Sequence, residues 1–138
     1  MERLFIQQGF YSGGFLNFTP KEALREVMES RATIVDVREV TLTGYKRFGV
    51  SAVIYIPYSQ LGEACETLSR TQPLIIADSV GLRSHEAMVL LKEKGFANIA
   101  NLAGGIVEWE RDGLPLSIDS SEQLDGSCMC QLRPRNKK

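Results

Sequence analysis

Apolar runs and polar segments alternate along the chain at the spacing expected of strands that are each followed by a helix. Short, nearly unbroken apolar runs predict strands at residues 15–18, 33–37, 53–56, 74–77 and 99–102. Between them, apolar positions recur at helical spacing and predict helices over residues 20–30, 59–69, 84–94 and 104–112. Strands buried on both faces are continuously apolar because helices cover the two faces of a parallel sheet. The pattern therefore predicts a single α/β domain with a mostly parallel sheet.

The first predicted helix has the clearest start signal. Thr19 is a favourable N-cap residue, and Pro20 suits the first helical position because its ring fixes a helical φ. The positions expected on the buried face of this helix are Leu24, Val27 and Met28.

Three segments of different character predict the domain organisation. Residues 1–18 form a lead-in, irregular to about residue 14, together with the first strand. Residues 19–116 form the folded domain, in which a polar stretch up to Gly49 separates two of the predicted strands. Residues 117–138 are polar and then basic, which predicts a flexible tail that carries Cys128 and Cys130.

Composition narrows the class of protein. The chain has 138 residues, 43% of them hydrophobic and 24% charged, which suits one soluble globular domain. Its net charge of −1 gives no general attraction to nucleic acid or to a membrane surface. No apolar run approaches the roughly 20 residues that span a bilayer, and the first residues lack the pattern of a secretory signal. Three cysteines do not make a disulfide framework. We therefore expect a cytoplasmic protein.

The segment LIIADSVGLRS, residues 74–84, carries the most specific chemical signal. An apolar strand runs into a short loop, and the loop closes at the start of a helix. Such a loop directs several backbone N–H groups to one point, and the helix dipole adds positive potential there, so an anion pocket is expected. The loop consists of Asp78, Ser79, Val80, Gly81, Leu82 and Arg83.

Four segments together resemble the rhodanese-like (sulfurtransferase) domain family. They are IVDVRE (34–39), AVIYIP (52–57), LIIADSVGLRS (74–84) and NLAGGIVEWERDGLP (101–115), and their order and separations fit that family from about residue 19 to residue 116. The resemblance implies a five-stranded, mostly parallel sheet flanked by helices on both faces. It also implies an active-site loop, C-x-x-G-x-R, whose cysteine accepts sulfane sulfur as a persulfide.

Two departures from this family pattern bear on activity. The loop keeps Gly81 and Arg83, but Asp78 stands where the resemblance implies the cysteine. The G-H-I-x-G-A piece of the family reads RFGVSA at residues 47–52, without its histidine. A carboxylate has no sulfur chemistry, so we expect residue 78 to be inactive in sulfur transfer. Instead, its side chain is expected to fill the pocket and to disfavour thiosulfate, sulfate or phosphate.

Other residues are candidates for supporting the pocket. Asp36 and Arg38 follow a central strand, where ligands lie in parallel sheets, and Ser84 begins the helix after the loop. An ion pair between Asp36 and Arg38 that fixes the loop, and direct contact with a substrate, both remain open. The Arg83 side chain is expected to find Asp78 or a loop carbonyl as its partner. His85, the only histidine, is expected to be an exposed helix residue.

The leading functional hypothesis is a catalytically inactive rhodanese-like module that binds or regulates a protein partner. The alternative is a thiosulfate-type sulfurtransferase or sulfur carrier that receives sulfur from a donor on Cys128 or Cys130. A third, less favoured reading makes Asp78 the nucleophile of a phosphatase. That chemistry needs a metal, and no acidic cluster near the loop offers ligands for one. The loop is also a residue shorter than that of the related cell-cycle phosphatases. No metal and no cofactor are expected.

Overall fold

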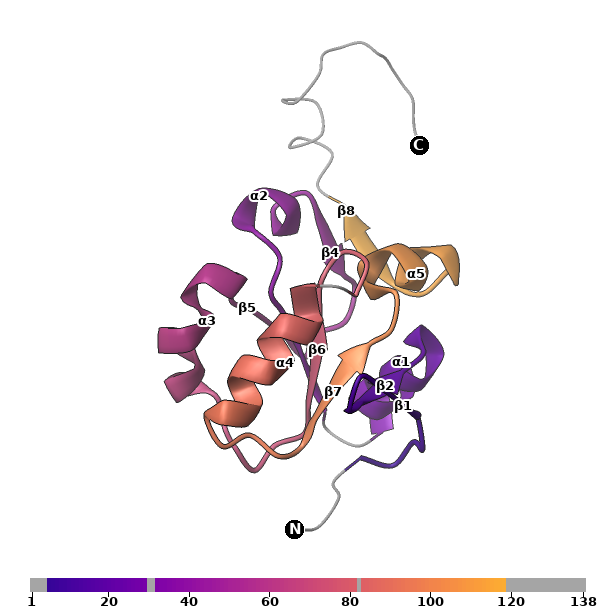
Figure 1. The fold of residues 1–138 in the computed structure, drawn as a ribbon. Coiled ribbons are helices and arrows are strands. Elements are labelled where there is room, and N and C mark those ends of the chain that lie inside the picture. The colour runs from indigo at the N-terminus through magenta and orange to yellow at the C-terminus, as the bar shows by residue number, and fades with distance from the viewer. Residues whose placement is uncertain (1–4, 30–31, 82, 119–138) are drawn as a thin grey trace.

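A mixed six-stranded sheet forms the centre of the molecule (Figure 1). The structure, a computed structural model, describes residues 5–29, 32–81 and 83–118. The strands run in the order β1-β2-β7-β6-β3-β5. Their bounds are β1 Phe10–Ser12, β2 Phe15–Phe18, β3 Thr33–Asp36, β5 Val53–Tyr55, β6 Leu74–Ala77 and β7 Ile99–Leu102.

Five of these strands are mutually parallel, and only β1 runs antiparallel to its neighbour β2. At the centre, β3 and β6 pair in register from Thr33 opposite Leu74 to Asp36 opposite Ala77. Both strands therefore end at one edge of the sheet, and the residues that follow them lie side by side. This edge positions the candidate site.

Helices cover both faces of the sheet (Figure 1). One face packs against α1 (Pro20–Glu29) and α5 (Gly105–Arg111), with Trp109 fully buried there. The other packs against α3 (Tyr58–Ala64), a 3-10 turn at Cys65–Thr67, and α4 (Arg83–Glu93). Alternate residues of β3 and β6 enter the two cores, as expected of strands that are buried on both sides. The predicted α/β class with a mostly parallel sheet is confirmed.

The start of α1 is fixed by a reciprocal pair of hydrogen bonds. The Glu22 N–H donates to Thr19 Oγ1 at 3.2 Å, and the Thr19 N–H donates to Glu22 Oε1 at 3.0 Å. This capping box satisfies two N–H groups that lack helical partners, which explains why the helix begins where the sequence predicts. The buried face differs from the prediction, however, because Met28 is exposed and Ala23 is buried instead.

Short elements depart from the sequence-based expectations. β1 adds a sixth strand within the supposed irregular lead-in, so the expected count of five holds only for the parallel strands. The polar stretch before Gly49 contains α2 (Val40–Thr43) and β4 (Lys46–Phe48). β4 pairs antiparallel with β8 (Leu116–Ile118) in a separate two-stranded sheet. β8 includes the first two residues of the predicted tail, and the rest of that tail lies outside the described residues.

Candidate functional site

The candidate site lies where β3 and β6 end, at the loop that joins β6 to α4. Asp36 is the last residue of β3, and Asp78 directly follows β6. In open parallel sheets, ligands lie outside the carboxyl ends of the strands, and this loop is at that position.

The Asp78 carboxylate occupies the point on which the loop N–H groups converge. Its Oδ2 accepts the N–H of Arg83 at 2.5 Å and the N–H of Ser84 at 3.0 Å, and its Oδ1 accepts the N–H of Gly81. Two of these donors belong to the first turn of α4, where the helix dipole favours a negative group. The side chain is only 4% exposed, so it sits inside the loop rather than in solvent.

The loop backbone is held from its other side by α5. The N–H of Ile106 donates to the Asp78 carbonyl at 2.9 Å, and the N–H of Val107 donates to the Ser79 carbonyl at 3.1 Å. Gly105 makes this approach possible, since its φ is +61° and a Cβ there would come within 2.5 Å of the Asp78 carbonyl oxygen. The loop conformation is therefore fixed by two helices.

Asp36 and Arg38 form a buried ion pair beside the loop. Arg38 Nη2 lies 2.7 Å from Asp36 Oδ2, and Arg38 Nε lies 2.9 Å from Asp36 Oδ1. Arg38 Nη2 also donates to the Lys46 carbonyl at 2.7 Å. The pair thus ties the end of β3 to β4, which is a structural role for both charges.

A cavity of about 300 Å³ opens at this loop. Its mouth carries exposed apolar side chains, with Val80 51% and Leu42 46% exposed. The residues that line the cavity are Val37, Arg38, Glu39, Leu42, Asp78, Ser79, Val80 and Arg83.

Within the described residues, the expectation that the Arg83 side chain pairs with Asp78 or a loop carbonyl was wrong. Only its backbone N–H reaches Asp78. Its guanidinium lies 3.9 Å from the Glu86 carboxylate and 5.9 Å from the centre of the Tyr58 ring. The Arg83 side chain is therefore exposed at the surface.

The family model of the rhodanese-like domain matches residues 19–112. The chain belongs to the rhodanese-like domain family. A protein named thiosulfate sulfurtransferase GlpE, from Actinobacillus succinogenes, is 28% identical over 102 residues, which cover 74% of this chain and 90% of that protein.

Solved structures agree with this assignment. A crystal structure of a rhodanese-related protein from Thermoplasma volcanium superposes with a TM-score of 0.67 at 26% identity, over 75% of this chain and 98% of that one. The solution structure of a rhodanese-like domain from Anabaena has a TM-score of 0.69 at 18% identity, over 88% of this chain and 94% of that one, and shares the fold.

A buried polar chain behind the loop of this rhodanese-like domain was not predicted. The Ser84 hydroxyl donates to Asn101 Oδ1 on β7, and Asn101 Nδ2 donates to Asn17 Oδ1 on β2 at 2.7 Å. Asn17 Nδ2 then donates to the Phe15 carbonyl at 2.9 Å. The sequence did contain a signal for this chain, namely two asparagines within otherwise apolar strands, because a buried amide needs hydrogen-bond partners.

The Tyr55 phenol of this rhodanese-like domain has a raised pKa. It pairs with Asp36 across β5 and β3. Burial raises the pKa of Tyr55 above its ordinary value of 10.0, and the negative charge of Asp36 raises it further, while Arg47 and Arg38 act in the opposite direction.

The remaining candidates of the rhodanese-like domain lie apart from the cavity or outside the described residues. Cys65 is fully buried in the core between the sheet and α3. His85 is exposed, as the sequence predicts. Leu82, Cys128 and Cys130 fall outside the described residues. In the part of the chain that the structure describes, no three side chains are grouped as metal ligands, and no helix could span a bilayer.

Proposed function

We propose that this rhodanese-like domain does not transfer sulfur at its loop and acts by binding a protein partner there. The proposal includes the inference that Asp78 takes the place of the sulfur-accepting cysteine in active members. The position of Asp78 directly after β6, with Gly81 and Arg83 at the family spacing, supports this inference.

The observation that carries the proposal is the set of three backbone N–H groups bonded to the Asp78 carboxylate. In this arrangement the loop's donors are already engaged by a tethered anion. An external oxyanion would have to displace this carboxylate or lie beside it, and like-charge repulsion opposes the second arrangement. The same donors would stabilise a thiolate or persulfide if residue 78 carried sulfur.

Residue 78 itself cannot form a persulfide, because that step requires a thiolate. Among the described residues, the one cysteine is Cys65, and it lies in the core, away from the residues that line the loop cavity. Sulfur transfer within the described part of the chain therefore has no accessible nucleophile of the required kind.

Exposed apolar side chains at the cavity mouth support a binding role. Val40 and Leu42 on α2 and Val80 on the loop are all exposed. Leu42 and Val80 line the cavity, and burial of such side chains against a partner is favourable by about 25 cal/mol per Å² of apolar area. A partner that places an apolar side chain in the cavity would bury this surface, and such binding does not require a free anion-binding site in the loop.

The decisive experiment compares thiosulfate:cyanide sulfur transfer by the wild-type protein, Asp78→Cys and Asp78→Ser. We expect no transfer above the protein-free rate from the wild type and from Asp78→Ser, and measurable transfer from Asp78→Cys. Serine is the matched control because it is similar in size to cysteine but has no sulfur. A wild-type protein that transfers sulfur at a rate lowered by Asp78→Ser would contradict the proposal.

A second measurement tests the tail thiols. The wild-type protein and the double variant Cys128→Ser, Cys130→Ser are incubated with a persulfide donor and weighed intact. We expect no mass gain of one sulfur on either protein. A gain on the wild type that disappears in the double variant would instead identify a sulfur carrier and overturn the purely binding role.

A further inference from the structure

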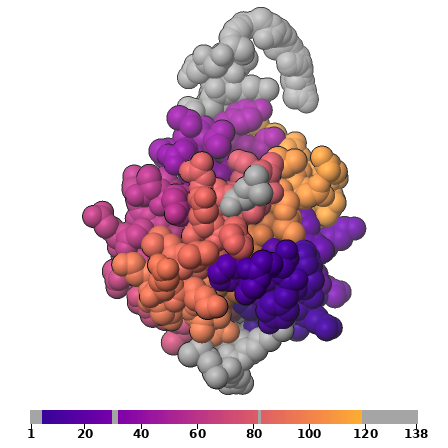
Figure 2. All heavy atoms as spheres, in the orientation of Figure 1, coloured from indigo at the N-terminus to yellow at the C-terminus, as the bar shows by residue number. Residues whose placement is uncertain are grey.

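A second and larger cavity, of about 500 Å³, lies at the opposite end of α4 from Asp78. The β1–β2 hairpin forms one wall, and the segment from the end of α4 to the start of β7 forms the other. Figure 2 shows the indigo surface of the hairpin beside the orange surface of this segment. Its volume is in the range of small-molecule sites, about 300–1,000 Å³.

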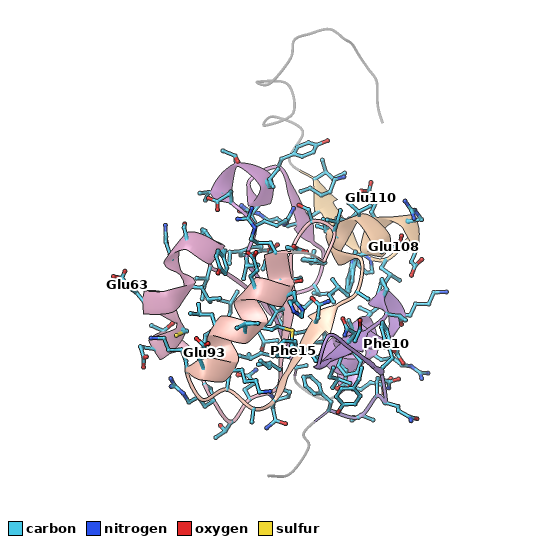
Figure 3. The ribbon with its side chains drawn as sticks, viewed as in Figure 1. Phe10, Phe15, Glu63, Glu93, Glu108 and Glu110 are labelled. Carbon is cyan, nitrogen blue, oxygen red and sulfur yellow. The ribbon has the colours of Figure 1, made fainter. Side chains whose placement is uncertain are left out.

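Four aromatic residues contribute to the lining of this cavity. Phe5 and Phe96 are buried beneath it, Phe15 is half-buried, and Tyr11 projects from the hairpin with its ring exposed. Figure 3 shows Phe15, the first residue of β2, beside α4. Rings arranged around a concave surface favour a flat apolar or aromatic ligand, which can stack on them or meet them edge to face.

Among the described residues that line this aromatic cavity, Lys92 is the one with a charged side chain. Lys92 Nζ lies 5.5 Å from the centre of the Phe15 ring, and no carboxylate in the described residues is within ion-pair distance of it. Arg70 lies over the Phe96 ring, but it is paired with Glu66 at 3.7 Å and is not among the residues that line the cavity. The charge at the cavity is therefore that of Lys92.

We propose that this cavity binds a small aromatic carboxylate, with its rings against Phe15 and Tyr11 and its carboxylate paired with Lys92. The aromatic side chains select the apolar body of the ligand, and the Lys92 ammonium selects its anionic group. This site is separate from the loop cavity, so the proposal does not depend on the function proposed for Asp78.

Naphthoate is a suitable probe, and naphthamide is its neutral counterpart of nearly the same shape. We expect naphthoate to bind with a Kd below about 1 mM and to shift the backbone amide signals of Gly14, Gly95 and Ala97 in nuclear magnetic resonance titrations. Naphthamide should bind at least about fivefold more weakly, because it lacks the charge that Lys92 attracts.

Two lysine variants distinguish a specific pair from general attraction. Lys92→Met keeps an apolar stem over Phe15 and removes the charge, so naphthoate affinity should fall about fivefold or more while naphthamide affinity stays the same. Lys94→Met removes an exposed charge from just beyond the same helix end without altering the cavity lining, and it should leave both affinities unchanged.

Three results would overturn the proposal. Equal binding of acid and amide would indicate an unselective apolar groove, and equal losses in Lys92→Met and Lys94→Met would indicate diffuse charge attraction. Shifts of the same amides on raising the protein concentration alone would indicate that a second copy of the chain occupies the groove.

Discussion

At the scale of single residues, Asp78 has two oxygens that satisfy three N–H groups at the turn into α4. Asp78→Ala removes the acceptor and leaves those donors without a protein partner. We expect the free energy of unfolding to fall by about 2 kcal/mol, since an unsatisfied buried donor costs about 1–3 kcal/mol and water can reach part of the loop.

Urea unfolding of Asp78→Ala beside Asp112→Ala measures this loss. Asp112 is an exposed residue after α5 for which we expect a change of less than about 0.5 kcal/mol. Unchanged stability of Asp78→Ala would mean that the carboxylate contributes no net stabilisation to the loop.

Tyr55 gives a prediction about alkaline pH. Because burial and Asp36 raise the pKa of Tyr55 in the folded state, the folded protein holds the phenolic proton more tightly than the unfolded chain. The resulting stabilisation is fully present below the unfolded pKa of 10.0 and is lost as the pH rises through the higher folded value. Tyr55→Phe should remove this component of the alkaline loss of stability, measured by urea unfolding below and above pH 10.

Tyr11→Phe is the control for that measurement. Tyr11 is exposed on β1, and its replacement should leave the alkaline profile as it is in the wild type. Identical profiles for wild type and Tyr55→Phe would contradict the assignment of the raised pKa to Tyr55.

At the scale of elements, the buried chain from Ser84 through Asn101 to Asn17 links α4, β7 and β2. Each amide satisfies the next, so removal of one member leaves the others with unmet hydrogen bonds. In a double-mutant cycle, Asn17→Ala and Asn101→Ala should each destabilise the fold, with a coupling energy of about 1 kcal/mol or more. Strictly additive losses would indicate that the two amides act independently.

The long elements could be predicted from the sequence because each carries its own signal. β6 and β7 have the predicted bounds, since a run of four apolar residues in β6, and one interrupted only by Asn101 in β7, mark strands buried on both faces. The sequence pattern did not predict α2, β4 and β8, because an element of three or four residues is too short to show a periodicity. β4 forms through its pairing with β8, about 70 residues away in the sequence, so no local pattern could reveal it.

The parts of the site that carry a local sequence signal could likewise be predicted. The strand–loop–helix pattern located Asp78 and its donors, and the position at the end of a central strand pointed to Asp36 and Arg38. The direction of the Arg83 side chain depends on Tyr58 and Glu86, and the large cavity depends on the approach of the hairpin to α4. Both are consequences of tertiary packing that no single segment encodes.

At the scale of the whole molecule, Pro115, the residue before β8, and Phe48 on β4 hold α5 in place through Trp109. The Pro115 carbonyl accepts Trp109 Nε1 at 2.6 Å and the Gly49 N–H at 2.8 Å, and the Phe48 ring meets the Trp109 ring edge to face at 5.0 Å. Phe48→Ala should therefore lower the free energy of unfolding by about 3–5 kcal/mol.

The same variant should move the fluorescence of Trp109, the only tryptophan, to longer wavelength because water gains access to its ring. Phe10→Ala on the exposed edge strand is the control and should leave the emission unchanged. Unaltered emission from a folded Phe48→Ala protein would show that Trp109 does not depend on this packing.

The positions of β8 and the N-terminal hairpin have a practical consequence for biosensor design. β8 pairs with β4, whose Lys46 carbonyl is bonded to Arg38 at the loop cavity, whereas Phe5 and the hairpin line the larger cavity. The hairpin and β8 lie far apart along the molecule (Figure 1). Immobilisation through the N-terminal end therefore leaves the loop cavity free for analytes, and immobilisation beyond β8 leaves the aromatic cavity free. Two orientations of one protein on a chip surface can thus report on the two cavities separately.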